Sequence, residues 1–126
     1  MPRVLARSTP LTALALLLAL GGCGEPPRVE RGGRAIALRL DEFRIDPPHV
    51  AARAGALRIV ARARGHLAHN LRVLSADERE VLARIPAMKP GVRGAIEVAL
   101  PPGDYVWICS IGNHRELGMR GTLRVR

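Results

Sequence analysis

Three side chains near the C-terminus of this chain could together bind a soft metal ion. Cys109 ends the aromatic and apolar run YVWIC, His114 follows five residues later, and Met119 comes five residues after that. A thiolate, an imidazole and a thioether therefore lie on one short segment between two strand-like stretches. Copper favours this mixture, because sulfur ligands select Cu(I) and imidazole suits both copper states.

A copper site that transfers electrons uses two histidines, one cysteine and a weak axial methionine, so a second histidine is needed. His49 follows two prolines in a turn and is expected at the surface. His66 and His69 flank the start of a strand, where alternation places them on opposite sides, so a joint site is not expected. His69, beside Asn70 at the start of an apolar strand, is the candidate ligand. A hydrogen-bonded histidine at the edge of the core is the alternative.

Length and composition limit the class of protein. The 126 residues fit one domain plus any segments that are cleaved off or disordered. The apolar content of 48% is ample for a hydrophobic core. Basic residues exceed acidic ones by nine. The arginines are scattered and aromatic residues are almost absent, so we expect no nucleic-acid partner. The charge is interpreted as a solvated basic surface.

The N-terminal segment has the pattern of an export signal. Two arginines precede an apolar run over residues 11–20, which is too short to span a bilayer. The sequence LGGC at 20–23 resembles the lipobox of bacterial lipoproteins, in which the cysteine is lipidated. This resemblance predicts a signal peptide over residues 1–22 and an extracytoplasmic protein, periplasmic or outward-facing, anchored to a bacterial membrane by lipidation of Cys23. Ordinary secretory cleavage that leaves Cys23 as a thiol is the alternative.

Lipidation of Cys23 would leave Cys109 as the one thiol of an exported chain. An unpaired cysteine in an oxidising compartment needs an explanation, and metal binding provides one. Residues 23–34 contain paired prolines and paired glycines and no periodic apolar face, so we expect a flexible tether without secondary structure. The tether would hold a domain of residues 35–126 close to the membrane.

From residue 35 onward the pattern is that of β-strands. Apolar residues alternate over residues 35–40, and residues 57–64 have small and apolar side chains on one side and mostly arginine on the other. Further strands are expected over residues 69–74, 95–100, 105–110 and 121–126. Residues 76–84 indicate one helical turn, or a short strand at Val81 and Leu82, and residues 85–94 a loop. The whole predicts an all-β Greek-key β-sandwich of about seven to eight strands.

The segments around the candidate ligands resemble the cupredoxins, the small blue copper proteins. In that family a His-Asn pair at a strand start gives the first ligand, as at His69-Asn70. A strand of the form Tyr-x-aromatic-x-Cys, as at residues 105–109, leads into a loop that gives the others. The similarity covers about residues 36–126 and includes EFRIDPP at 42–48. It implies a cupredoxin-like fold and one type 1 copper ion with four ligands: His69, Cys109, His114 and Met119. It also implies that Asn70 ties the two ligand segments together through Ser110.

The spacing Cys-x₄-His-x₄-Met resembles rusticyanin and sulfocyanin more than plastocyanin, whose step from cysteine to histidine is shorter. Many relatives have a proline just before the loop histidine, where this chain has Gly112-Asn113. The loop is therefore expected to be more flexible than in those relatives. The ligand set does not depend on this difference, but the redox potential cannot be predicted from the sequence.

The resemblance implies a monomeric carrier of single electrons between redox proteins. His114 is expected to be the ligand nearest solvent, within an apolar rim of Leu67, Ile111 and Leu117. An enzyme is not expected, because the remaining histidines are too few for a second copper centre. The basic charge favours an acidic redox partner. A copper carrier or storage protein without electron transfer is the main alternative. A metal-free sandwich that uses the cysteine and the methionine as core residues is another.

Overall fold

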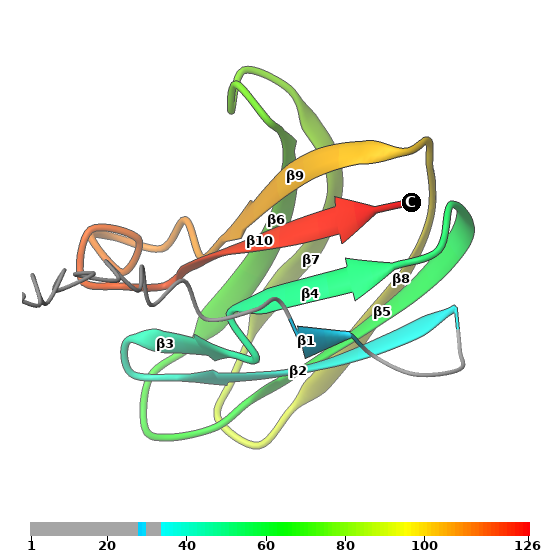
Figure 1. The fold of residues 1–126 in the computed structure, drawn as a ribbon. Helices are drawn as coiled ribbons and strands as arrows, with labels where there is room; N and C mark the ends of the chain where they lie inside the picture. The colour runs from blue at the N-terminus through cyan, green and yellow to red at the C-terminus, as the bar shows by residue number, and fades with distance from the viewer. Residues whose placement is uncertain (1–27, 30–33) are drawn as a thin grey trace, which may run out of the picture.

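The chain folds into two β-sheets packed face to face (Figure 1). This computed structural model describes residues 28–29 and 34–126, so the predicted signal peptide and Cys23 lie outside the described residues. One sheet has the order β1-β4-β10-β9-β6-β7 and the other β3-β2-β5-β8. The strands are β1 (Arg28–Val29), β2 (Ala35–Asp41), β3 (Arg44–Asp46), β4 (His49–Ala52), β5 (Gly55–Ala63), β6 (His69–Ser75), β7 (Val81–Met88), β8 (Arg93–Leu100), β9 (Gly103–Ile108) and β10 (Arg120–Val125).

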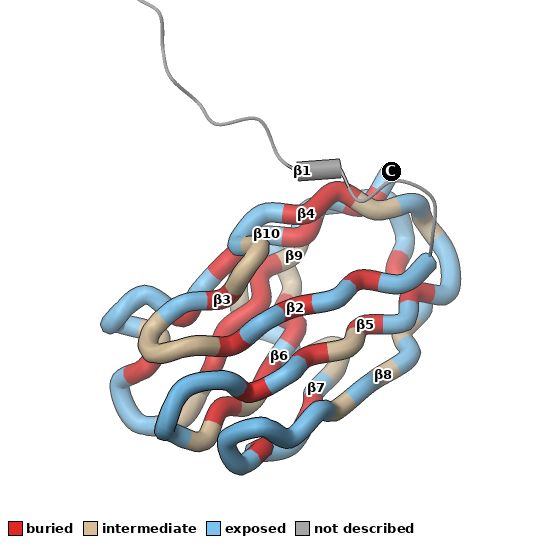
Figure 2. The backbone as a smooth tube through the Cα atoms, turned by 90° about the horizontal axis from the view of Figure 1, so that it is seen from below, coloured by how far each residue is buried: buried red, intermediate tan, exposed pale blue. Residues whose placement is uncertain are grey.

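The predicted all-β sandwich is confirmed, with ten strands among the described residues where about seven to eight were expected. The alternation read from the sequence places the core. In β2 every second side chain, Ile36, Leu38 and Leu40, is buried between the sheets, and β5 buries Leu57 and Ile59 in the same way. Figure 2 shows the resulting alternation of buried and exposed segments along these strands. Within the described residues no helix is long and apolar enough to cross a membrane.

The region from residue 76 to 94 differs from the prediction. The expected helical turn over residues 76–84 is wrong, whereas the alternative of a short strand at Val81 and Leu82 is confirmed, because β7 runs from Val81 to Met88. The loop expected over 85–94 is shorter than predicted, because β8 begins at Arg93. Pro86 suggested a loop because it cannot donate a ladder hydrogen bond. A proline is tolerated on an edge strand or at a bulge, and β7 is an edge strand that pairs with β6 alone.

The pairing of β6 with β7 contains a bulge beside the predicted site. His69 pairs with Met88 and Leu71 pairs with Ile85, so two residues of β7 lie opposite Asn70. Such bulges bend a strand and re-aim its side chains. The bulged strand here is β7, and the bulge lies opposite the start of β6, where the first candidate ligand lies.

β1 lies within the segment predicted to be a tether without secondary structure. Its two residues pair in parallel with β4, Arg28 with Val50 and Val29 with Ala51. A two-residue strand has no sequence periodicity, which is why the pattern gave no sign of it. The boundaries at residues 22 and 34 stay predictions.

Candidate metal centre

The structure brings three of the predicted ligands into one buried cluster. The donor atoms of His69, Cys109 and His114 all lie within 4.8 Å of one another. His69 is the first residue of β6, Cys109 directly follows β9, and His114 lies in the loop between β9 and β10. In Figure 1 this orange loop lies at the end of the sandwich opposite the C-terminus.

Backbone hydrogen bonds hold the loop of residues 109–119 closed on itself. The amide of Cys109 donates to the carbonyl of Met119 at 3.1 Å, and the amide of Met119 donates to the carbonyl of His114 at 3.0 Å. Met119 is fully buried directly before β10, and its main chain is thus bonded to two of the three clustered residues. The assignment of Met119 as the fourth ligand stays a prediction.

Asn70 connects the two segments that supply the ligands. Its Nδ2 donates to Ser110 Oγ at 2.9 Å, and its Oδ1 accepts from the Ser110 amide at 2.7 Å. The Asn70 amide also points at Cys109 Sγ, 3.5 Å away. The start of β6 and the end of β9 are therefore fastened to each other next to the cysteine sulfur.

His69 is fully buried, and within the described part of the chain neither of its ring nitrogens has a hydrogen-bond partner. Burial lowers the pKa of His69 below its usual range, and the charge of His114 lowers it further. The imidazole is therefore neutral near pH 7, which is the form that binds metals. Two unpaired nitrogens in a dry interior are costly unless another group satisfies them.

The donor set and its spacing fit a bound metal ion. Cys109 Sγ lies 3.6 Å from His114 Nδ1. Bonds of about 2.0 Å to nitrogen and 2.3 Å to sulfur, set about 120° apart, would separate those two atoms by about 3.7 Å. One ring nitrogen of His69 offers the third donor atom. Two imidazoles, a thiolate and a nearby thioether are the donor set of a blue copper site.

The turn between β2 and β3 also belongs to this site, which the sequence did not predict. The ring of Phe43 packs edge-on against the His114 imidazole, with centroids 4.9 Å apart. Gly118, with φ at +127°, has no room for a side chain, because an added Cβ would lie 2.8 Å from the Phe43 carbonyl oxygen. On the other side, Glu42 Oε1 lies 3.5 Å from His69 Nε2. The only sequence signal for this turn is an acid next to an aromatic residue in EFRIDPP, which is common in exposed turns.

Exposure differs among the four predicted ligands. The solvent-exposed fraction is 8% for His114 and 0% for His69, Cys109 and Met119. Two residues of the predicted apolar rim are open to solvent, Leu67 at 42% and Leu117 at 50%. Ile111, the third, is partly buried against the core.

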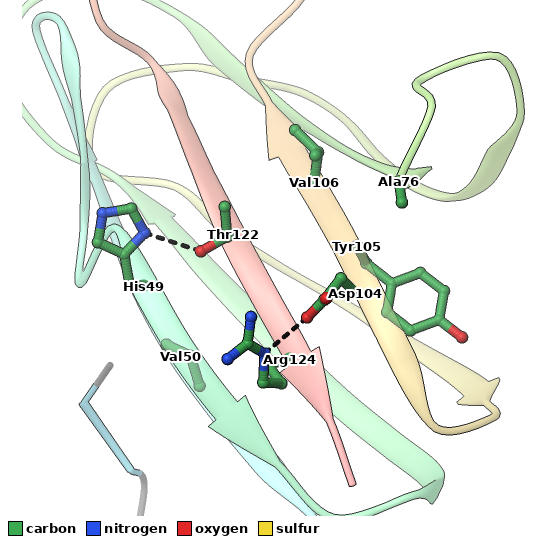
Figure 3. Close-up of a pocket in the computed structure, with 8 residues that line it drawn as sticks. All are labelled: His49, Val50, Ala76, Asp104, Tyr105, Val106, Thr122 and Arg124. Atoms are coloured by element: carbon green, nitrogen blue, oxygen red, sulfur yellow. Dashed lines mark hydrogen bonds and ion pairs between the residues drawn. The ribbon is translucent and has the colours of Figure 1, made fainter. Parts of the chain in front are cut away.

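The two remaining histidines lie outside the cluster and are exposed. His49 lines a surface pocket of about 440 Å³ on β4, β9 and β10, where its Nδ1 contacts Thr122 Oγ1 at 2.8 Å (Figure 3). The carboxylate in that pocket, Asp104, pairs with Arg124 at 2.7 Å. The pocket therefore offers one histidine and an occupied carboxylate, not a set of metal ligands.

Comparisons with known proteins support the fold. No protein-family model matches the chain, and no curated protein matches its sequence. Auracyanin from Roseiflexus castenholzii superimposes with a TM-score of 0.68 at 19% identity, over 75% of this chain and 98% of that one. An azurin, Az-iso2, from Methylomonas sp. strain J gives 0.64 at 13% identity, over 73% and 97%. A Cu(I) structure of an amicyanin variant gives 0.57 at 20% identity, over 77% and 87%. The fold is therefore the cupredoxin-like sandwich that the sequence predicted.

Proposed function

We propose that this chain is a type 1 copper protein that carries single electrons between redox partners. The observation that carries the proposal is the buried cluster of His69, Cys109 and His114 inside a cupredoxin-like fold. A copper ion held by these residues and Met119 would supply reversible one-electron chemistry near the end of the sandwich. The Cu(I) form of an amicyanin variant among the similar structures agrees with that choice of metal.

The residues of the chain would do three things for such a site. Complete burial of Cys109 and His69 excludes water from the thiolate and the first imidazole. The bonds from Asn70 to Ser110 and those of the closed loop fix the ligand positions before any metal binds. A frame that is already ordered leaves little to rearrange when an electron arrives, and low reorganisation is what fast electron transfer requires.

His114 is the residue through which we propose that electrons enter and leave. It is the most exposed of the four ligands, and Leu67 and Leu117 offer apolar surface for a partner. The excess of basic residues favours an acidic partner, chiefly by raising the association rate. We propose that the protein acts as a monomer.

We further propose that the protein is exported and held at a bacterial membrane by lipid on Cys23. The basis is the sequence: a signal-like segment over residues 1–22 and LGGC at 20–23. Mass spectrometry of the membrane fraction tests this proposal, with Cys23→Ser as the control. A diacylglycerol-modified N-terminus at Cys23 is expected. An unmodified Cys23 in a soluble mature chain would contradict it.

The electron-carrier proposal is tested by voltammetry of the copper-loaded protein. The expected result is one reversible one-electron wave, with both oxidation states keeping the metal in the presence of a competing chelator. A copper carrier would instead lose Cu(I) readily to the chelator and show no stable wave. We also propose that the ligand loop is of the type found in rusticyanin and sulfocyanin. The voltammetry result does not depend on this loop type.

The route through His114 is tested with His114→Gly and added imidazole. Imidazole should restore the blue colour, while transfer to the redox partner should stay slow, because a free imidazole does not present the same packed edge to the partner. Wild-type rates in the reconstituted variant would show that electrons use another route.

A further inference from the structure

The carboxylate of Glu42 caps the loop that leads into the first candidate ligand. Its Oε1 accepts hydrogen bonds from the amides of His66 at 2.8 Å and Leu67 at 2.6 Å. These two amides belong to the connection between β5 and β6, twenty-four and twenty-five residues away along the chain. A side chain that satisfies two consecutive amides orders the backbone that carries them.

Gly65 leaves the space in which this carboxylate sits. Its φ is +80°, a conformation that L side chains rarely adopt, and an added Cβ would collide with the Glu42 carboxylate. The loop therefore turns around the acid at close range. The contact between Glu42 and the loop therefore depends on the backbone conformation at Gly65 as well as on the Glu42 rotamer.

The same carboxylate oxygen reaches the buried histidine. Glu42 Oε1 lies 3.5 Å from Nε2 of His69, which leaves Nδ1 as the nitrogen free to face the other donors. A metal-binding histidine commonly donates its second ring N–H to a carboxylate or carbonyl, which fixes the tautomer and the ring orientation. The side chain of Glu42 remains 24% exposed, so it links the dry cluster to the surface.

The next residue completes the contact between this turn and the site. Phe43 packs edge-on against the His114 ring, and the two imidazoles lie 5.2 Å apart between their centroids. Consecutive residues of one turn thus contact the two imidazoles, Glu42 the ring of His69 and Phe43 the ring of His114. The turn between β2 and β3 holds the relative position of both rings, although it supplies no ligand.

We infer that Glu42 is a positioning residue of the metal centre, which orients His69 through Nε2 and places a fixed negative charge beside the site. The inference rests on the proposed copper function. A negative charge stabilises Cu(II) relative to Cu(I), because the oxidised ion carries one more positive charge. Glu42 therefore lowers the reduction potential as well as ordering the ligand.

The two roles are separated by two substitutions. Glu42→Gln keeps an oxygen that can accept from the His66 and Leu67 amides but removes the charge. Glu42→Ala removes both. The reduction potential is expected to rise in both variants. Copper affinity should fall about 10- to 100-fold in Glu42→Ala, the usual effect of losing a partner behind a ligating histidine, and by less than about 10-fold in Glu42→Gln.

Asp104→Asn provides the matched control. Asp104 is an ion-paired carboxylate near the start of β9, five residues before Cys109, so about 16 Å of strand separate it from the cysteine. The same loss of one negative charge there should leave copper affinity unchanged and shift the potential much less. A potential in Glu42→Gln that matches the one in Asp104→Asn would overturn the electrostatic part of the inference.

A readout on the metal-free protein separates this inference from the copper proposal. Amide hydrogen exchange at His66 and Leu67 should accelerate at least 10-fold in Glu42→Ala and stay near the wild-type rate in Glu42→Gln. The nitrogen NMR spectrum should show His69 protonated at Nε2. Unchanged exchange in Glu42→Ala, or a proton on Nδ1, would overturn the positioning role. Failure of the wild type to bind copper would instead refute the proposed function and leave these metal-free results standing.

Discussion

Replacing Asn70 with alanine tests whether this side chain fastens the two ligand segments together. The substitution removes two hydrogen bonds to Ser110, of 2.9 and 2.7 Å. At about 0.5–1.5 kcal/mol net for each bond, the free energy of unfolding of the metal-free protein should fall by about 1–3 kcal/mol. Ser110→Ala removes only the bond to the hydroxyl and should cost about 0.5–1.5 kcal/mol.

The double variant gives the sharper test. Ser110→Ala should cost nothing further once Asn70 is alanine, because its partner is already gone. The two single effects should therefore exceed the double effect by about 1 kcal/mol, the coupling expected for residues in direct contact. Urea denaturation followed by tryptophan fluorescence measures all four proteins. Additive effects, or an Asn70→Ala loss below about 0.5 kcal/mol, would refute the reasoning.

Three further substitutions test the packing and ion pairs around the site. Gly121→Ala should destabilise the fold by about 1–3 kcal/mol in urea denaturation, because a Cβ there would collide with the Trp107 indole. Gly103→Ala, whose Cβ would meet its nearest neighbour at 3.5 Å, should be close to neutral, and equal effects would contradict the packing argument. Glu78→Gln should change the free energy of unfolding by less than about 1 kcal/mol, since its ion pairs with Arg115 and Arg120 are both partly exposed. It should nevertheless accelerate amide exchange in the loop of residues 109–119, which contains Arg115. A larger loss of stability with unchanged amide exchange would show that Glu78 stabilises the fold as a whole and does not order this loop.

Much of this architecture can be predicted because the alternation of apolar and polar residues along a strand shows which side chains are buried. The strands at residues 35–40 and 57–64 are buried on one face, and period 2 shows this directly. The cluster residues were also predictable, since Cys109 and His114 share one loop. The position of His69 at a strand start made it a candidate, but only the resemblance favoured a ligand over an ordinary buried histidine.

The parts that were missed depend on contacts distant in sequence. Pro86 and its neighbours form an edge strand because β6 offers hydrogen bonds to them, and local propensity carries no trace of that partner. Glu42 acts on amides more than twenty residues away, at His66 and Leu67. From the sequence alone, an acid in a turn is expected to be solvated. Its role depends on the β5–β6 connection, which only the fold brings into contact with it.

The proposed function depends on copper binding by the Cys109 thiolate together with two histidines. The most direct test is the visible absorption spectrum of the protein loaded with Cu(II), compared with Cys109→Ser loaded in the same way. An intense band from thiolate-to-copper charge transfer is expected in the wild type and should be absent from Cys109→Ser. A colourless wild type, or a band that persists in Cys109→Ser, would contradict it.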